Sequence, residues 1–408
     1  MDLHHRKVLL VSYTHKVRGE PTYMAGPPQD CARYLRERAA KLTFIEQPNP
    51  ISDDLTLTAT VWERGALVAT VRCPWGWPRP REGRNIQDRA PGYYLGFKLR
   101  ELLGTLYLLW KTHDRYDLYI GVEAVNAMLG VWLRGWGCVR YVVYDVIDYS
   151  PQRFASSWLN RLFHGMDGWC AARVDACWNQ TPLVGQERAR RHLRGLSRQL
   201  VKPSGMPAER VWSLPDEQVE RTTLTYVGTL QARDGVWGML EALPVILRTV
   251  PTCRLRIIGS GNEELAMKRW VAARDLSRHV EFLGMIGDPA VVESWVAKSR
   301  VALAPYRNDP GSVKRYNDPS KPRLYLACGT PVVITRVPLV ADEIHREGAG
   351  VAVEDAPQAL AQGVLRVLTD EAFYRTCRQG AVRLAACYTW ERIFDRLFAS
   401  MNGAAAHD

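Results

Sequence analysis

Lys321 stands in a stretch where a cation is chemically unexpected. The stretch, residues 316–335, reads YNDPSKPRLYLACGTPVVIT. Asp318 or Ser320 can cap a helix that Gly329 would end before a β-branched strand. Lys321 then lies in the first turn, where the helix dipole favours an anion and disfavours a cation. A bound phosphate would be held by the helix amides and the ammonium together, so the stretch predicts an anion site. A solvated surface lysine is the alternative.

Glycine-bearing turns follow two other candidate strands in the same half of the chain. Gly228 and Thr229 come after the run LTYV and are followed by Arg233, so this turn offers backbone amides and positive charge to a phosphate. Gly284 ends the run VEFLG and Met285 follows it, and a glycine at this point allows close approach of a flat ring. Such turns are common in α/β proteins, so a purely structural role is the alternative for each.

The first half of the chain carries fewer residues that indicate chemistry. Asp148 follows the run YVVYDVI, where its carboxylate could act as an acid or base or cap the next segment. Trp75 and Trp77 lie with several arginines in residues 72–94, and indole rings stack on sugars or settle at membrane interfaces while arginine pairs with phosphate. A packed proline-rich loop is the alternative there. Gly26 lies in the loop after the first candidate strand.

Short apolar runs must position these residues, and helical patterns separate the runs. The runs cover residues 7–13, 116–122 and 140–148 in the first half, and 223–229, 254–260, 279–284, 300–306 and 331–335 in the second. Continuous apolar runs between helices are typical of parallel strands buried on both faces. We therefore expect an α/β protein with two doubly wound, Rossmann-like domains, whose ligands bind at the carboxyl ends of the strands.

A chain of 408 residues is too long for one ordinary core, so two domains are expected. Residues 202–220 contain three prolines and a glycine without sustained periodicity, which is typical of a connector. We place the domains at residues 1–201 and 222–384, with a linker at residues 202–221. Residues 385–408 remain as a C-terminal helix.

Composition limits the partners and the compartment. The net charge of +11 and the pI near 9.3 favour anionic partners, although a merely soluble basic protein is the alternative. Nine scattered cysteines without zinc-ligand spacing predict reduced thiols and no metal site. The N-terminal apolar run is too short for a signal peptide, and residues 95–111 are too interrupted by charge to span a bilayer but could lie on one. We expect a cytoplasmic protein, with peripheral attachment to the cytoplasmic face of the membrane as an option.

The order of the motifs resembles that of GT-B retaining glycosyltransferases, specifically glycosyltransferase family 4 (glycosyl transferases group 1). The motifs that carry the resemblance to the C-terminal half are YVGTLQARDG, LRIIGSGNEE, VEFLG, VALAPY, DPSK with YLACGTPVV, and YTWERIFDRLF. DLYIGVEAVNAMLGVWLRGWG and VVYDVIDYSPQRF resemble N-terminal domains in one branch of the family. The resemblance covers about residues 115–397, and ACGTPVV with its upstream lysine is its most specific part.

The resemblance implies a GT-B fold, in which two Rossmann-like domains face a central cleft. It implies transfer of a sugar from a nucleotide-diphosphate sugar to an acceptor hydroxyl, with retention and without a metal or other cofactor. Residues 1–201 would bind the acceptor, with Asp148 as the candidate for orienting or deprotonating its hydroxyl. Residues 222–384 would bind the nucleotide sugar, and the helix in residues 385–408 would cross back to the first domain. Synthesis of a cell-surface polysaccharide or glycolipid is the expected setting.

By position in the motifs, the resemblance assigns roles to the second-half residues. The diphosphate would be approached by Gly228, Thr229, Arg233, Ser320 and Lys321. Gly284 and Met285 would lie beside the base. Two glutamates that the family usually carries eight residues apart, near the donor sugar and the ribose, are Tyr316 and Leu324 here, so Tyr316 would face the donor sugar without a carboxylate. Thr229 and Asp234 replace an arginine and a lysine that commonly flank the glycine of the first turn.

Several alternatives remain open at this point. The preferred acceptor is a polyprenyl-diphosphate-linked saccharide at an anionic membrane surface, and a nucleic acid or a small soluble acceptor is the alternative. A catalytically silent GT-B protein that binds or scaffolds is the alternative to an enzyme. An NAD-dependent enzyme is disfavoured because the turn IIGSGNEE lacks the third glycine of a dinucleotide fingerprint. The sequence does not indicate an oligomeric state.

Overall fold

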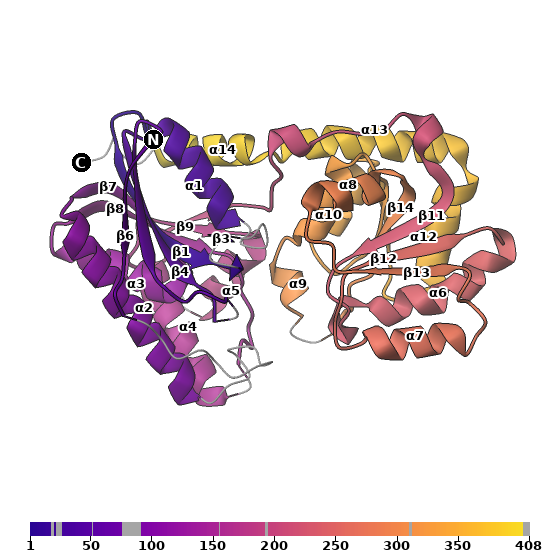
Figure 1. The fold of residues 1–408 in the computed structure, drawn as a ribbon, viewed down its shortest axis with the longest axis horizontal. Coiled ribbons are helices and arrows are strands. Elements are labelled where there is room, and N and C mark those ends of the chain that lie inside the picture. The colour runs from indigo at the N-terminus through magenta and orange to yellow at the C-terminus, as the bar shows by residue number, and fades with distance from the viewer. Residues whose placement is uncertain are drawn as a thin grey trace. The chain divides into compact units, whose positions relative to one another are not determined.

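Two compact units make up the chain in the computed structural model (Figure 1). The structure describes residues 1–17, 20–21, 27–50, 52–75, 91–154, 156–191, 195–309 and 312–402. The first unit contains Met1–Pro203 and Ile393–Asp408, and the second contains Ser204–Arg392. Each has a mainly parallel sheet with helices on both faces, which confirms the predicted α/β class with two Rossmann-like domains. Gly26 and Trp77 lie outside the described residues.

The first unit has an eight-stranded sheet in the order β10-β9-β8-β7-β1-β4-β5-β6. Its strands are β1 (Lys7–Thr14), β4 (Lys41–Pro48), β5 (Thr58–Glu63), β6 (Ala66–Arg72), β7 (Tyr116–Val122), β8 (Val139–Val146), β9 (Ala176–Asn179) and β10 (Arg198–Val201). The pairs β4–β5 and β5–β6 are antiparallel and the other pairs are parallel. The two-residue strands β2 (Lys16–Val17) and β3 (Glu20–Pro21) form a separate antiparallel pair.

The chain winds away from β1 in two directions, which distributes the helices over both faces of this sheet. The helices of this unit are α1 (Pro27–Arg38), α2 (Pro91–Thr112), α3 (Glu123–Gly135), α4 (Ser157–Ala171), α5 (Pro182–Arg191) and most of α14 (Trp390–Asn402). Right-handed crossovers put α1, which leads to β4, on the face opposite α3 and α4, which lead to β8 and β9. The direction of winding changes between β1 and β7, and such a switch point is where open α/β sheets bind ligands.

The helix α14 packs on the same face of the first unit's sheet as α1. The ring of Tyr34 on α1 stacks on Phe398 with centroids 5.7 Å apart, and its hydroxyl donates to Asp395 at 2.6 Å. Trp178 on β9 lies 6.2 Å from Phe394. The C-terminal helix therefore completes the first unit's core. Within the described residues, no helix is both long enough and apolar enough to span a bilayer.

The second unit has a six-stranded, fully parallel sheet in the order β13-β12-β11-β14-β15-β16. Its strands are β11 (Glu220–Val227), β12 (Arg254–Ile258), β13 (Val280–Gly284), β14 (Ser299–Ala304), β15 (Val332–Thr335) and β16 (Gly350–Val353). Its helices are α6 (Val236–Thr249), α7 (Glu264–Ala272), α8 (Pro289–Ala297), α9 (Val313–Tyr316), α10 (Ser320–Ala327), α11 (Val340–Arg346), α12 (Pro357–Thr369) and α13 (Glu371–Cys387). Figure 1 shows α6 and α7 on one side of this sheet and α8 and α10 on the other.

Each face of this sheet buries its own hydrophobic core. One core includes Leu240 and Leu243 of α6, and the other includes Tyr325 and Leu326 of α10. The winding changes direction between β11 and β14, so the loops after these two strands meet at the switch point of the second unit.

The segment predicted as a linker packs within the second unit. The amide of Met206 donates to the carbonyl of Tyr388 at 3.0 Å, and the amide of Trp212 donates to the carbonyl of Ala327 at 2.8 Å. The regular elements in this segment are short 3₁₀ turns at Ala208–Arg210 and Asp216–Gln218 and the start of β11 at Glu220. The chain passes between the units after Pro203 and again within α14.

Candidate active site

Backbone turns build the carboxyl edge of the second unit's sheet. The amide of Gly228 donates to the carbonyl of Ile258 at 2.9 Å, and the amide of Gly259 donates to the carbonyl of Gly284 at 2.7 Å. A Cβ at Gly259 would lie 2.0 Å from the carbonyl oxygen of Gly228, so the two turns pack backbone against backbone. The edge is therefore lined by main chain that a ligand can approach closely.

Lys321 is held against this edge by the helix α10. One turn further along α10, the hydroxyl of Tyr325 accepts a hydrogen bond from the amide of Val227 at 2.9 Å, which anchors the helix to the end of β11. A Cβ at Gly228 would lie only 2.1 Å from Nζ of Lys321. The ammonium therefore lies directly over the first glycine turn, at the switch point of the sheet.

The ammonium of Lys321 has no counterion in the described part of the chain. Its side chain is half-buried, and burial lowers its pKa to about 8. Asp234 opposes this shift, whereas Lys314 and Arg233 lower the pKa further. Asp234 is itself 3.5 Å from Lys314. A partly desolvated cation among other cations is an arrangement that an anion would stabilise.

The predicted side-chain cap of α10 is wrong. The helix begins at Ser320 after Pro319, and neither Asp318 nor Ser320 caps it. The carboxylate of Asp318 instead accepts hydrogen bonds from the amide of Ser204 at 2.8 Å and from Nε of Arg323 at 3.1 Å. Asp318 is thus a buried structural residue, and Ser320 is exposed at the helix start.

The remaining residues predicted for the donor lie on loops at the same end of the sheet. Thr229 and Arg233 follow β11 and are exposed, and Met285 is exposed immediately after Gly284 at the end of β13. Tyr316 is half-buried and ends α9, between β14 and β15. The structure shows direct packing for Gly228 with Lys321 and places the others on neighbouring loops.

Gly235 fixes the loop that carries Arg233. It adopts a left-handed conformation with φ of 76° at the start of α6. A Cβ there would lie 1.4 Å from the carbonyl oxygen of Pro305, which follows β14. Only glycine fits where the loops after β11 and β14 meet.

In the first unit, Asp148 lies two residues beyond β8. Its amide donates to Oε1 of Glu123 at 3.3 Å, and its carbonyl accepts from Nη1 of Arg153 at 2.6 Å. Its side chain is exposed. Trp75 is exposed beyond β6, and its ring lies 5.2 Å from that of Tyr107 on α2. The structure therefore places Asp148 at the carboxyl edge and Trp75 beside α2.

A cluster of charged side chains at the switch point of the first unit was not predicted. Glu123, directly after β7, has a φ of 68° and pairs with Arg153 at 2.9 Å, and burial raises the pKa of its carboxyl although Arg153 opposes the shift. Lys98 donates to the hydroxyl of Tyr13, near the end of β1, at 2.9 Å and pairs with Glu101 at 2.7 Å. A non-glycine residue with positive φ costs of order 1–3 kcal/mol, and such strain concentrates at functional sites. The available signal was a glutamate directly after an apolar run.

Comparison with known proteins finds a family model that matches part of the second unit. Residues 221–370, less than half of the chain, match the model described as Glycosyl transferases group 1. Gly228, Gly284 and Lys321 all fall within the matched residues. No group of three or more histidine, cysteine, aspartate or glutamate side chains in the described residues is arranged to hold a metal ion.

Two curated relatives come from Mycobacterium tuberculosis. The GDP-mannose-dependent alpha-(1-6)-phosphatidylinositol dimannoside mannosyltransferase is 25% identical over 194 residues, which cover 48% of this chain and 46% of that protein. Glycogen synthase is 24% identical over 244 residues, which cover 59% of this chain and 57% of that protein. The chain thus spans about half the length of the curated relatives it matches.

Three similar solved structures are covered along their whole length. Sucrose-phosphate synthase from Thermosynechococcus elongatus has a TM-score of 0.68 at 18% identity, covering 98% of this chain and 100% of that one. Pneumococcal O-GlcNAc transferase GtfA, solved with UDP and GlcNAc, has a TM-score of 0.65 at 11% identity, covering 99% of this chain and 100% of that one. Anabaena HepE, solved with UDP, has a TM-score of 0.63 at 13% identity, covering 97% of this chain and 100% of that one. These likenesses confirm the GT-B fold.

Proposed function

We propose that the chain is a glycosyltransferase that moves a sugar from a nucleotide-diphosphate sugar to an acceptor hydroxyl. The observation that carries this proposal is the ammonium of Lys321, half-buried and without a counterion in the described residues, packed over Gly228 at the switch point. Its position inside the residues that match the glycosyl transferases group 1 model supports the proposal, as do the UDP complexes of HepE and GtfA.

In the proposed reaction, the second unit stabilises the leaving nucleoside diphosphate. Departure of the diphosphate concentrates negative charge on its oxygens, and preorganised cations and amides there lower the barrier by several kcal/mol. Lys321 and the backbone at Gly228 and Thr229 hold the diphosphate, with Arg233 and Ser320 completing the shell. Gly284 and Met285 lie beside the base, and Tyr316 faces the donor sugar.

Retention and metal independence are further parts of the proposal. The retaining outcome is supported by the resemblance of the motif order to family 4, and it does not require a protein nucleophile. The positive charge that the diphosphate needs is supplied by Lys321 and Arg233, side chains at the edge already described.

On the acceptor side, we assign Asp148 to orienting or deprotonating the acceptor hydroxyl. Its backbone is fixed by Glu123 and Arg153 while its carboxylate is exposed at the carboxyl edge of the first sheet. The acceptor is a lipid-linked saccharide at the cytoplasmic face of an anionic membrane, in the synthesis of a cell-surface polysaccharide or glycolipid. The net charge of +11 and the lipid substrate named for the mycobacterial mannosyltransferase support this choice.

A catalytically silent binding or scaffold protein is the second candidate. Tyr316 and Leu324 stand where the family usually has carboxylates, and neither side chain can replace an acid. This candidate keeps the GT-B fold and explains the substitutions without sugar transfer.

Thermal-shift measurements with UDP, GDP, ADP and dTDP sugars, followed by donor hydrolysis assays, separate the two candidates. An enzyme is expected to be stabilised by one donor class and to release nucleoside diphosphate from it. Stabilisation without turnover in the presence of lipid-linked and soluble sugar acceptors supports the silent protein. Absence of stabilisation by any of the nucleotides contradicts the donor site itself.

A further inference from the structure

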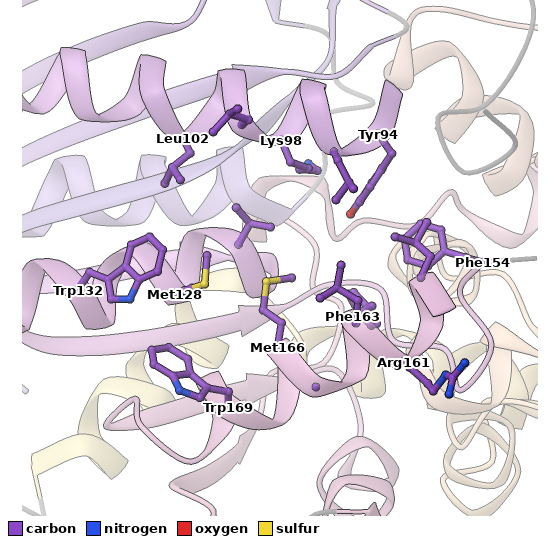
Figure 2. A pocket seen from close by; sticks show the side chains of 16 residues that line it. Tyr94, Lys98, Leu102, Met128, Trp132, Phe154, Arg161, Phe163, Met166 and Trp169 are labelled. Atoms are coloured by element: carbon purple, nitrogen blue, oxygen red, sulfur yellow. The ribbon is translucent and has the colours of Figure 1, made fainter. Parts of the chain in front are cut away.

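An apolar groove of about 700 Å³ lies between three helices of the first unit (Figure 2). The helix α3 packs against both α2 and α4 and contributes Met128 and Trp132 to the groove. Leu99 of α2 and Leu162 of α4 line it while 57% and 49% exposed. Apolar side chains left in contact with water in a concave surface indicate a ligand that covers them, and the volume is that of a ligand pocket.

The groove ends beside the carboxyl edge of the first sheet. Figure 2 shows the indoles of Trp132 and Trp169 towards one end, and Tyr94 with Phe154 towards the other. At the second end, Lys98 lines the groove and donates to Tyr13 near the end of β1 at 2.9 Å. The groove therefore runs from the indoles of Trp132 and Trp169 towards the edge where Asp148 lies.

A second contact ties the groove to the residues around Asp148. Phe163 lines the groove, and the guanidinium of Arg153 lies 4.8 Å from the centroid of its ring. Arg153 in turn donates to the carbonyl of Asp148 and pairs with Glu123. A molecule that fills the groove would thus meet the proposed acceptor site at its polar end.

The charge of Arg161 favours an anionic amphiphile. Lys98 and Arg161 are the cations of the lining, which contains no carboxylate within the described residues. Lys98 pairs with Glu101 at 2.7 Å, behind the lining, so Arg161 is the cation that can bind an anion. Arg161 is exposed, makes no ion pair among the residues described, and lies at the same end as Phe154 (Figure 2). Along α4 the lining runs from Leu159 to Trp169, which is about 15 Å at the rise of an α-helix.

We propose that this apolar groove binds the hydrocarbon chain of a lipid phosphate or diphosphate, the acceptor of the proposed glycosyltransferase. The chain lies between α2 and α4, the phosphate lies near Arg161, and the linked sugar extends towards Asp148. This inference rests on the proposed function, because the lipid is assigned as the acceptor. A concave site suits a single chain, whereas a bilayer surface would need a flat or convex face.

Gly165 permits a variant that fills the groove without disturbing the fold. It lines the groove on α4, and a Cβ there would meet no atom within 4 Å. Gly135, at the end of α3, has equally open surroundings and does not line the groove, so Gly135→Phe is the matched control for Gly165→Phe.

Binding is measured on the full chain by quenching of tryptophan fluorescence with a brominated dodecyl phosphate, used below its micelle concentration. We expect saturable quenching, since Trp132 and Trp169 line the groove. Gly165→Phe is expected to weaken the apparent affinity by at least about tenfold, or ~1.4 kcal/mol, and Gly135→Phe to leave it unchanged. Arg161→Glu is expected to weaken binding of the alkyl phosphate and not of brominated dodecanol.

Three results would overturn the proposal. Wild-type protein could show no saturable quenching, or the two glycine variants could lose affinity equally. Binding to phosphatidylglycerol vesicles without binding of the monomeric alkyl phosphate would assign the groove to a bilayer surface. A dimer that Gly165→Phe dissociates, with no alkyl phosphate binding, would assign it to a second copy of the chain.

The nucleotide-sugar thermal shifts of the same samples keep the two proposals separable. If the groove proposal fails, stabilisation by nucleotide persists in the wild type and in Gly165→Phe. If the proposed function fails, the wild type shows either no stabilisation by nucleotide or stabilisation without sugar transfer, whatever the result with the alkyl phosphate.

Discussion

The ammonium of Lys321 occupies the space that a side chain at position 228 would need. A Cβ at Gly228 would lie 2.1 Å from Nζ of Lys321, so the glycine turn after β11 and the first turn of α10 form one structural unit. Tyr325 fixes this geometry by binding the backbone of Val227. This packing explains how a cation can be held at a helix N-terminus that disfavours it. Substitution of either Gly228 or Lys321 therefore tests the contact.

Gly228→Ala is expected to weaken binding of a nucleoside diphosphate by about tenfold, or ~1.4 kcal/mol. The added methyl group meets the flexible end of the Lys321 side chain, so the ammonium moves. The φ of 153° at this position is one that alanine rarely adopts, so the variant is also expected to lose some stability. Isothermal titration with UDP and GDP measures the change. Gly287→Ala is the control, because a Cβ there meets no atom within 4 Å in the loop after β13. Equal affinity in Gly228→Ala and the wild type would contradict a role for this contact.

The stability of the chain is expected to depend on the protonation of Lys321. Its pKa is about 8 in the folded protein, below the ordinary value of 10.5. Between these values the unfolded chain binds a proton that the folded chain releases, so the free energy of unfolding rises with pH. The loss in free energy of unfolding that comes from burying the charged lysine is fully present below pH 8 and disappears above about pH 10.5. Its size is on the order of 1 to 3 kcal/mol.

Urea unfolding of wild type and Lys321→Met at several pH values measures this dependence. The variant is expected to be the more stable protein at pH 7, and the difference is expected to shrink as the pH rises through 8 towards 10.5. A difference that stays constant over this interval would show that the lysine is not desolvated.

Gly235→Ala is expected to destabilise the second unit by several kcal/mol, the range of mutations that force backbone into backbone. The methyl group would overlap the carbonyl of Pro305 and would require a left-handed conformation of alanine. Gly238→Ala, three residues later in α6, meets no atom and is expected to stabilise by about 0.5 to 1 kcal/mol. The midpoint of urea unfolding distinguishes the two, and similar midpoints would contradict the packing of this turn.

Asp148→Asn is expected to lower the rate of sugar transfer by about 10²-fold or more, the range of a positioned acid or base. Binding of the nucleotide sugar and the unfolding midpoint should not change, because the side chain is exposed. Transfer is measured with the donor that gives the largest thermal shift. Asp175→Asn serves as the control, since Asp175 pairs with Arg134 on the same unit. Transfer by Asp148→Asn at the wild-type rate would remove the role assigned to Asp148.

Most of the strands that the sequence predicted are buried on both faces, although β4 and β9 are equally buried and were missed. The run at residues 116–122 coincides with β7, whose side chains are almost all buried. The antiparallel pair of β5 and β6 was not predicted, because β6 is exposed along nearly its whole length and carries little apolar periodicity towards a core. Burial by helices on both faces, which creates the continuous apolar signal, is absent at that edge.

The sequence indicated those features of the candidate site that depend on neighbouring residues in the chain. It did not indicate those that depend on contacts between segments far apart in the sequence. Gly228 and Lys321 were both assigned to a phosphate from their own turns, but their contact depends on the docking of α10 against β11. Asp318 was expected to cap α10 and instead binds Ser204, which lies 114 residues earlier in the chain. The role of Glu123 depends on its pairing with Arg153 across two loops, which no local pattern indicates.

The central claim is that Lys321 binds the diphosphate of a nucleotide sugar, and titration of Lys321→Met with UDP and GDP tests it most directly. The control is Lys268→Met, because Lys268 is exposed on α7, carries the same charge and pairs with Glu264. We predict that Lys321→Met loses at least about tenfold in affinity, or ~1.4 kcal/mol, while unfolding no more easily at pH 7, and that Lys268→Met binds as the wild type does. Unchanged affinity in Lys321→Met, or an equal loss in both variants, would contradict the account.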